Sequence, residues 1–297
     1  MTGTFPLVTI ITPVYNGAEF LEPLIESVQS QSYPNIEHIV IDDGSQDDGK
    51  TKAILSRYPH IKSWSRQNRG QYPTMNEGLQ AATGEWVCFI SADDLMEPDA
   101  VNGVIQIVLQ RADCDVIYGK ARFVRDVTYK MDTLSGDEVK LENDAVQGWL
   151  TWAPPGWYPW VGHIYHCSVY VKRSDLLERG LIFDEKLKYT GDFDWMVRLV
   201  RSGLNFRYKN KILASVRIHP EKASIVHTEQ QTQEHALLLE RYGINRWLYT
   251  RIAGIRYLRS ILFETISMLG RGQFKTFGWR AHRWFRNKVS NRQVNKN

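Results

Sequence analysis

The chain has 297 residues, of which 43% are hydrophobic and 24% are charged, and this composition excludes an intrinsically disordered protein. Its three cysteines, Cys88, Cys114 and Cys167, include no CxxC pair, so we expect no disulfide framework or zinc cluster and a reducing, cytoplasmic location. The net charge of +4 conceals an asymmetry, because residues 241–297 hold 13 Lys or Arg and one acid, whereas the remainder is acidic.

The N-terminus has no basic stretch followed by an apolar region, so we expect no signal peptide. No apolar run approaches the ~18 residues of a membrane-spanning helix, so we expect none. The length allows one large domain or two small ones.

Strand and helix signals alternate over the first 120 residues. Strand-like runs are expected at 7–11, 37–41, about 61–65, 86–90 and 115–118. Helical patterns are expected at 20–28, about 74–82 and 97–109. Continuous apolar strands separated by helices predict a parallel sheet that is covered on both faces. In such sheets, ligands bind beyond the carboxyl ends of the strands.

The pattern changes after residue 120. A loop rich in proline and aromatic residues spans 153–160, a helix is expected around 194–201, and a strand at 206–218. The chain from about 226 onward is predicted to be helical, with apolar residues at helical spacing.

Two acidic pairs follow strand-like runs in the first third of the chain. Asp42 and Asp43 follow the run at 37–41, and Asp93 and Asp94 follow the run at 86–90. Adjacent carboxylates repel each other, and a hard divalent cation such as Mg²⁺ or Mn²⁺ would offset that repulsion and bridge to a phosphate. The two pairs therefore indicate a site for a nucleotide diphosphate.

Five motifs occur in an order typical of one enzyme family: Thr12-Pro-Val-Tyr-Asn16, Asp42-Asp-Gly-Ser45, Asn76-Glu-Gly78 with Ala82-Thr-Gly-Glu85, Ser91-Ala-Asp-Asp94, and Gly191-Asp192 with Arg198. Together they resemble the inverting glycosyltransferases of family 2, including enzymes of the spore-coat-polysaccharide type. The resemblance implies the α/β GT-A fold, a Rossmann-like, mostly parallel sheet with helices on both faces. It further implies a catalytic domain at 1–225, with a nucleotide-binding half at 1–120 and an acceptor half at 121–225, followed by a basic helical extension at 226–297.

The resemblance places the nucleotide near the first two strand ends. It implies that Asp43 holds the base, while Thr12, Pro13 and Tyr15 shape the cradle for base and ribose. The alternative for the Asp42–Ser45 segment is a tight turn with local hydrogen bonds.

Two further residues are candidates for the donor site. Asn76 belongs to the third motif. Arg69 flanks, together with Arg66, a loop near the expected phosphates. A solvated surface position is the alternative for both arginines.

The resemblance places a cation, Mn²⁺ or Mg²⁺, at the second acidic pair. It implies that Asp94 binds the metal and that Asp93 binds the ribose or a water on the metal, with His219 reaching the metal or the diphosphate. Ser91 stands where the family usually has the first acid, which weakens this expectation. The alternatives are an N-cap pair for the helix at 97–109 and an ordinary histidine.

For the catalytic base, the resemblance selects Asp192, which removes the proton of the acceptor hydroxyl. Many members have Glu-Asp here, whereas this chain has Gly191-Asp192. Asp194 and Asp184 are rivals, and helix capping is the alternative role. His166 is expected on the wall of the acceptor pocket, and Trp157, Tyr158 and Trp160 either stack on the acceptor or pack within their loop.

The resemblance implies transfer of a sugar from a UDP-, GDP- or dTDP-sugar to a saccharide or lipid-linked saccharide in the assembly of surface polysaccharide or glycolipid. The basic, aromatic-rich C-terminal region favours peripheral binding to an anionic membrane at its inner face. No nucleic-acid-binding module is recognised. The alternatives are a nucleotidyltransferase that makes a nucleotide-sugar and a non-catalytic protein that binds one.

Overall fold

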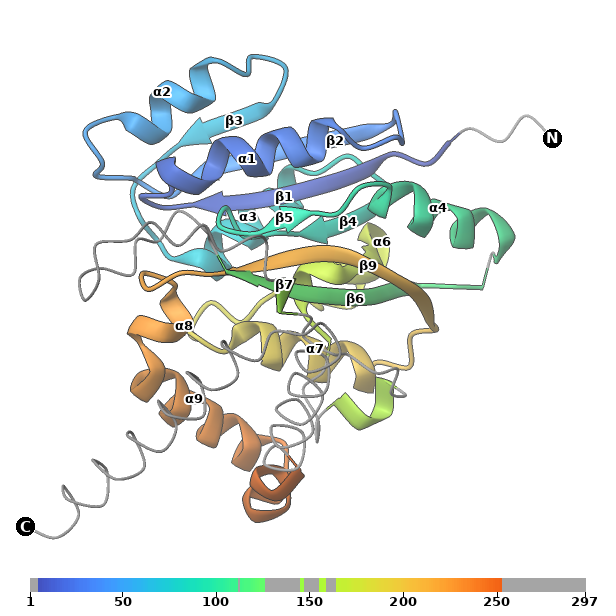
Figure 1. Ribbon diagram of the computed structural model, residues 1–297. Coiled ribbons are helices and arrows are strands. Elements are labelled where there is room, and N and C mark those ends of the chain that lie inside the picture. The colour runs from blue at the N-terminus through green and yellow to red at the C-terminus, as the bar shows by residue number, and fades with distance from the viewer. Residues whose placement is uncertain (1–4, 112, 126–144, 147–154, 159–163, 253–297) are drawn as a thin grey trace, which may run out of the picture. The chain divides into compact units, whose positions relative to one another are not determined.

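Figure 1 shows the computed structural model, which describes residues 5–111, 113–125, 145–146, 155–158 and 164–252. The strands in this part of the chain are β1 (Val8–Val14), β2 (Ile36–Asp42), β3 (Lys62–Ser65), β4 (Trp86–Phe89), β5 (Leu95–Met96), β6 (Val116–Arg125), β7 (Ala145–Val146), β8 (Val169–Lys172) and β9 (Phe206–Ile218). The α-helices are α1 (Ala18–Gln29), α2 (Lys50–Ser56), α3 (Gln71–Ala81), α4 (Ala100–Gln110), α6 (Arg173–Glu178), α7 (Gly191–Arg201), α8 (Ala223–Val226) and α9 (Thr228–Arg241). Two short 3-10 helices are η1 (Pro155–Trp157) and η2 (His166–Ser168).

The strands form one sheet in the order β3-β2-β1-β4-β8-β6-β9-β5, with β7 paired to β6. The first four strands are parallel, as the alternation of strands and helices predicts. Strand β8 lies antiparallel between β4 and β6, and β9 then pairs in parallel with β6. The predicted α/β fold is therefore confirmed, with antiparallel strands inserted in the second half of the sheet.

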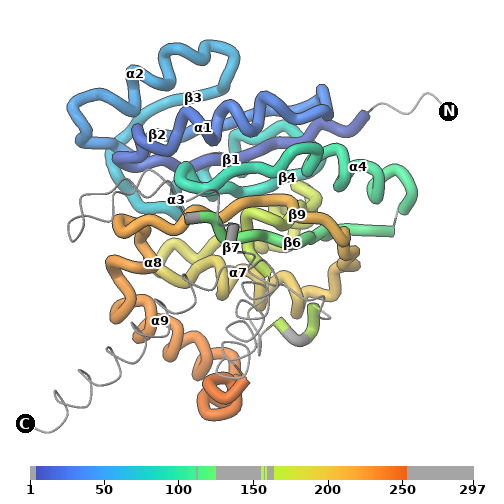
Figure 2. Tube along the Cα trace, in the orientation of Figure 1, coloured from blue at the N-terminus to red at the C-terminus, as the bar shows by residue number. Residues whose placement is uncertain are grey.

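Helices cover both faces of this sheet because successive residues of a strand point to opposite sides. On β1, Ile10 belongs to one buried cluster with Leu24 and Ile25 of α1. Its neighbour Ile11 lies on the other face under α3, where a Cβ added to Gly78 would stand 2.4 Å from Ile11 Cγ2. Glycine at that position thus allows α3 to lie close against β1. Figure 2 follows the same path as a tube.

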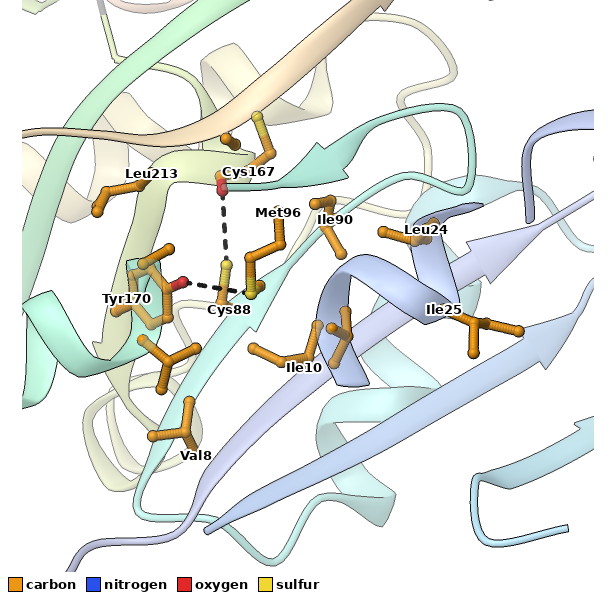
Figure 3. Close-up of a cluster of buried hydrophobic side chains, with 14 of the residues drawn as sticks. Val8, Ile10, Leu24, Ile25, Cys88, Ile90, Met96, Cys167, Tyr170 and Leu213 are labelled. Atoms are coloured by element: carbon orange, nitrogen blue, oxygen red, sulfur yellow. Dashed lines mark hydrogen bonds between the residues drawn. The ribbon is translucent and has the colours of Figure 1, made fainter. Parts of the chain in front are cut away.

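The core between the sheet and α1 is apolar and includes the buried cysteines Cys88 and Cys167 (Figure 3). Cys88 of β4 directs its Sγ toward the carbonyl oxygen of Cys167 at 3.7 Å, and the Tyr170 hydroxyl lies 3.9 Å from Met96 Sδ. Burial raises the pKa of the Cys88 thiol to about 12, so this group stays protonated at neutral pH. These contacts join β4 to η2 and β8 to β5, on either side of the second acidic pair.

The chain divides into two compact units, Met1–Arg246 and Trp247–Asn297. Helices α8 and α9 belong to the first unit, so that unit continues past the predicted domain boundary at residue 225. Across the described residues, no helix has the length and apolar character needed to cross a membrane.

Candidate functional site

The carboxyl ends of three parallel strands meet at one edge of the sheet. Val14 of β1 is in register with Asp42 of β2, and Ile11 of β1 is in register with Phe89 of β4. The loops that follow β1 and β2 are tied together, because the Asn16 backbone N–H donates to Ser45 Oγ at 2.8 Å. Both predicted acidic pairs therefore lie at the same edge, as expected for a ligand site in a parallel sheet.

Asp43 is buried and shapes the loop at 66–70. Its carboxylate accepts hydrogen bonds from the backbone N–H groups of Arg69 and Gly70, each at 2.8 Å, and from the Arg66 guanidinium. Arg66 also pairs with Glu77 at 2.6 Å, so its charge is already compensated within the protein. These bonds fix the loop beside the strand end. The contact of Asp43 with a nucleotide base stays a prediction.

The predicted cradle residues occupy three different environments. Thr12 is fully buried, and its Oγ1 lies 3.1 Å from His38 Nε2. Pro13 is buried in β1, whereas the ring of Tyr15 is exposed just beyond the strand end. Of these three side chains, Tyr15 is the one whose exposure suits direct contact with a ligand.

The two other candidates for the donor site, Arg69 and Asn76, also differ in exposure: Arg69 is exposed and Asn76 is buried. The Arg69 side chain is exposed and lies 3.8 Å from Glu185. The Asn76 amide is buried, donating to the Phe183 carbonyl at 2.9 Å and accepting from the Phe183 N–H at 2.9 Å. These bonds tie α3 to the segment before α7, so the structure gives Asn76 a positioning role. Its predicted direct contact with the donor gains no support from this geometry.

Asp93 and Asp94 lie between β4 and β5, and the helix-capping alternative for them is wrong. The N-cap position of α4 belongs to Asp99, and α4 begins at Ala100. The Asp94 side chain is 4% exposed and accepts the Arg217 backbone N–H at 3.2 Å, while the Asp93 side chain is 21% exposed. Asp93 is therefore the more accessible of the two, and the predicted division of roles between them stays a prediction.

Lys222, which the sequence motifs did not single out, lies between the two carboxylates. Its Nζ is 2.5 Å from Asp93 Oδ2 and 3.1 Å from Asp94 Oδ1. His219 Nε2 is 3.1 Å from the same Asp93 oxygen, and its ring packs on Phe20 with 4.3 Å between ring centroids. The sequence held one signal for this role of Lys222: it is a basic residue three positions after His219, shortly after the end of β9.

The close charges act on the pKa values of this cluster. Burial raises the pKa of Asp93, but the bond from His219 and the charge of Lys222 outweigh it and lower the value to about 2. Burial and the neighbouring Asp93 raise the pKa of Asp94 to about 6. Burial opposes a raised pKa at Lys222, but the two carboxylates outweigh it, so the ammonium stays charged.

The arrangement does not fit a divalent cation while Lys222 holds this position. Among the described residues, no three His, Cys, Asp or Glu side chains converge closely enough to bind a metal ion. One oxygen of Asp94 faces the ammonium and the Arg217 N–H, and His219 Nε2 faces Asp93. The predicted ligands Asp94 and His219 are thus brought together, but around a lysine.

Asp192 lies in the first turn of α7 and is partly open to solvent. Its side chain is 42% exposed, and Oδ1 accepts the Phe193 N–H at 2.8 Å. His166 of η2 places Nδ1 at 3.8 Å from Asp192 Oδ2, and the carbonyl of the next residue, Cys167, lies 3.7 Å from Cys88 Sγ of β4. His166 therefore lies between the predicted base and the strand that leads into the acidic pair. Its position on the wall of an acceptor pocket stays a prediction.

The two rival acids have structural partners. Asp194 is 1% exposed, lies 2.8 Å from Arg198 and accepts the Tyr242 hydroxyl at 2.5 Å. Asp184 lies 3.2 Å from Arg241. Because a base needs a free lone pair within reach of the acceptor, the geometry favours Asp192 over both.

The loop before α7 is held by a carboxylate from α9. Glu234 accepts the backbone N–H groups of Lys188 at 2.8 Å, Tyr189 at 2.8 Å and Thr190 at 2.7 Å, and the Thr190 hydroxyl at 2.8 Å. These bonds fix the three residues before Gly191, and so the start of the helix that carries Asp192. Tyr158, which was expected either to stack on the acceptor or to pack, is buried against Phe193. Trp160 lies outside the described residues.

Comparison with known proteins gives a consistent result. Residues 9–158 match the family model for glycosyl transferase family 2. An uncharacterized glycosyltransferase of Rickettsia felis is 30% identical over 221 residues, which cover 74% of this chain and 35% of that protein. The chondroitin synthase of Escherichia coli is 24% identical over 271 residues, 88% of this chain and 37% of the synthase. The chain thus spans about a third of the length of these relatives.

Two solved structures share the fold. Residues 1–349 of Staphylococcus aureus TarS, in complex with UDP-GlcNAc, align with a TM-score of 0.55 at 16% identity over 72% of this chain and 59% of that one. The mannosyltransferase PcManGT of Pyrobaculum calidifontis, in complex with GDP-Man and Mn²⁺, aligns with a TM-score of 0.55 at 18% identity over 84% and 69%. At these identities the similarity shows the fold.

Proposed function

The chain belongs to glycosyl transferase family 2, and we propose that it transfers a sugar from a nucleotide-diphosphate donor to a hydroxyl group of an acceptor saccharide. One observation carries this proposal. The half-exposed carboxylate of Asp192 lies 3.8 Å from His166 Nδ1, and the next residue, Cys167, contacts Cys88 of β4, the strand that leads into the acidic pair. We infer from this that a base for the acceptor and a charged cluster for the diphosphate belong to one site.

The reaction that suits this site is a single displacement. Asp192 takes the proton of the acceptor hydroxyl as its oxygen attacks the anomeric carbon. The bond between that carbon and the diphosphate oxygen breaks on the opposite face, and the nucleoside diphosphate leaves with the electron pair. The anomeric configuration inverts, and no covalent intermediate with the protein is needed, as in inverting sugar hydrolysis with an alcohol in place of water.

We infer that the nucleotide lies over the ends of β1 and β2 and that the diphosphate points toward Asp93. Tyr15 and Arg69 are exposed beside this edge, and Asp43 fixes the loop that carries Arg69. The donor is a UDP-, GDP- or dTDP-sugar. The UDP-GlcNAc complex of TarS and the GDP-Man complex of PcManGT support this donor class.

We propose that the acceptor is a growing polysaccharide or a lipid-linked saccharide. The similarity to a chondroitin synthase supports a polysaccharide. The net positive charge of residues 241–297 supports binding of the protein to the anionic inner face of a membrane. Within the second unit, Trp247 is exposed and the Arg251 guanidinium lies 4.9 Å from its ring centroid, a pairing suited to a lipid headgroup region.

The membrane proposal is tested by vesicle sedimentation. The truncation must follow Arg246, because Arg241 and Tyr242 contact the buried Asp194. We expect this truncated protein to lose binding to vesicles that contain phosphatidylserine, most clearly at low salt. Equal binding by the full and truncated chains contradicts the proposal.

The predicted Mn²⁺ or Mg²⁺ is supported by the Mn²⁺ complex of PcManGT. In this chain the carboxylates of Asp93 and Asp94 are the oxygen ligands that such an ion would use. They hold the Lys222 ammonium instead. We therefore assign no step of the reaction to a metal ion.

Family membership does not favour the two alternatives, a nucleotidyltransferase or a non-catalytic binding protein. The test is release of nucleoside diphosphate by the full chain from a panel of UDP-, GDP- and dTDP-sugars with saccharide acceptors. We expect acceptor-dependent release with at least one donor. Formation of a nucleotide-sugar from a nucleoside triphosphate supports the first alternative, and binding without turnover supports the second.

A further inference from the structure

We propose that the Lys222 ammonium is the built-in counter-cation of this site, so that the protein binds a nucleoside diphosphate and releases it as leaving group without a divalent metal ion. This inference rests on the proposed function. The inference goes beyond the proposed function because it assigns the positive charge that stabilises the departing diphosphate to a residue of the chain itself.

The position of Lys222 is defined by its backbone. Lys222 precedes α8, where β9 ends, and its N–H donates to the His219 carbonyl at 3.1 Å. Its own carbonyl accepts the N–H groups of Ile225 at 2.8 Å and Val226 at 3.0 Å. The lysine thus belongs to a hydrogen-bonded turn, and its side chain, 17% exposed, extends from that turn to the acidic pair.

The donors of the ammonium suit a phosphate as a third partner. An ammonium group has three N–H donors. Two of them are directed at Asp93 Oδ2 and Asp94 Oδ1, at 2.5 and 3.1 Å. The third remains for an oxygen of the diphosphate. As the bond to the sugar breaks, negative charge grows on that oxygen, and a positioned ammonium stabilises it electrostatically with no transfer of its proton.

The same residues present a poor ligand set for a divalent cation. Ser91 replaces the first acid of the family motif, and its hydroxyl lies 3.2 Å from Gln71 Nε2. Mg²⁺ requires about six ligands at ~2.1 Å. To bind between Asp93 and Asp94 it would have to displace an ammonium that already forms ion pairs with both carboxylates. The lysine and the metal ion are therefore exclusive occupants of one position.

The first experiment measures binding of UDP, GDP and dTDP by calorimetry, in EDTA and in Mn²⁺. It compares the full-length wild type with Lys222→Met, Lys222→Arg and the control Lys209→Met. Lys209 lies near the opposite end of β9, where it bonds Gln106. Thermal unfolding of each variant checks that it is folded.

We expect the wild type and Lys209→Met to bind their preferred diphosphate equally well in EDTA and in Mn²⁺. In EDTA, Lys222→Met should lose about 10- to 100-fold in affinity, the range for a hydrogen bond to a charged group. Lys222→Arg, which keeps the charge, should retain most of it. The inference is overturned if the wild type needs Mn²⁺ for binding, or if Lys222→Met binds in EDTA as well as the wild type does.

The second experiment needs no nucleotide. Titration with Mn²⁺, followed by electron paramagnetic resonance, should show at least about tenfold tighter binding to Lys222→Met than to the wild type, because a competing positive charge is gone. A tight Mn²⁺ site in the wild type that Asp93→Asn abolishes contradicts the inference. Should no diphosphate bind under any condition, the proposed function fails, while the Mn²⁺ titration still decides the role of Lys222.

Discussion

The ring of Tyr72 in α3 occupies the space that a Cβ atom on Gly191 would need at the start of α7. An added Cβ would lie 2.7 Å from Tyr72 Cε2 and 2.8 Å from Cδ2 and Cζ. This contact explains why glycine precedes the predicted base where many relatives are expected to have glutamate. It also means that the position of Asp192 depends on how α3 and α7 pack.

The substitution Gly191→Ala should therefore destabilise the protein and displace Asp192. We expect a loss of about 1–3 kcal/mol in the free energy of unfolding, the usual range for overpacking, together with slower transfer. Urea unfolding and transfer rates measure the two effects.

A double-mutant cycle with Tyr72→Ala tests the cause. If the ring is responsible, Gly191→Ala should cost less by about 1 kcal/mol or more in the Tyr72→Ala background. Gly156→Ala is the control, because among the described residues, apart from its chain neighbours, no atom lies within 4 Å of its added Cβ. A cost that is equal in both backgrounds shows that Tyr72 is not the obstacle.

Glu234 should give a pH-dependent contribution to stability. Burial raises its pKa, but the N–H and hydroxyl donors at 188–190 outweigh burial and lower the pKa from 4.5. A depressed pKa in the folded state means that the contribution is complete above pH 4.5 and is lost as pH falls through the folded value. Glu234→Gln should therefore lower the melting temperature at pH 7, and this effect should shrink as the pH falls below 4.5 and through the lowered pKa of the folded state. A difference that is constant with pH contradicts this assignment.

Asp192 and Asp194 lie two residues apart and should respond differently to the same substitution. Asp194→Asn removes a buried charge from Arg198 and should cost about 2–4 kcal/mol of stability. Asp192→Asn affects a half-exposed carboxylate and should leave the melting temperature within about 2 °C of the wild type. Thermal unfolding of the two variants provides the comparison, and equal destabilisation would remove the structural distinction between them.

A substitution of Asp43 can show whether its carboxylate recognises the nucleotide base or only holds the loop at 66–70 in place. If its carboxylate contacts the base, Asp43→Asn should change the order of affinity among UDP, GDP and dTDP by about tenfold or more. If it only holds the N–H groups of Arg69 and Gly70, all three affinities should fall together. Asp48→Asn, at an exposed position in the same connection, is the matched control.

Much of the fold followed from the sequence because its signals were local. Apolar runs separated by helical patterns predicted the parallel strands, and the strand expected at 206–218 has those bounds. The strand expected at 115–118 instead extends to Arg125. Pairing with β9 holds residues 119–125 in the strand, although their sequence has no strand-like pattern. Strand β8, a four-residue segment, was not predicted, since its pairing with β4 and β6 is entirely non-local.

The sequence identified several residues of the site but not the side chains that they contact. The family resemblance selected Asp93, Asp94, His219 and Asp192, and the fold places the first three together. The ion pair with Lys222 depends on a contact between segments 128 residues apart, which spacing does not reveal. The same holds for the Tyr72 ring at Gly191 and for the amide of Asn76, which binds the Phe183 backbone.

The most direct measurement is the rate of sugar transfer by Asp192→Asn beside the wild type, with the donor and acceptor identified from the panel and donor affinity measured in parallel. Asp113→Asn, whose carboxylate pairs with Arg207 near the other end of β9, is the control. We expect Asp192→Asn to bind the donor normally and to lose about 100-fold or more in rate, the usual contribution of a general base, while Asp113→Asn transfers at the wild-type rate. Transfer by Asp192→Asn at the wild-type rate would contradict the proposed mechanism.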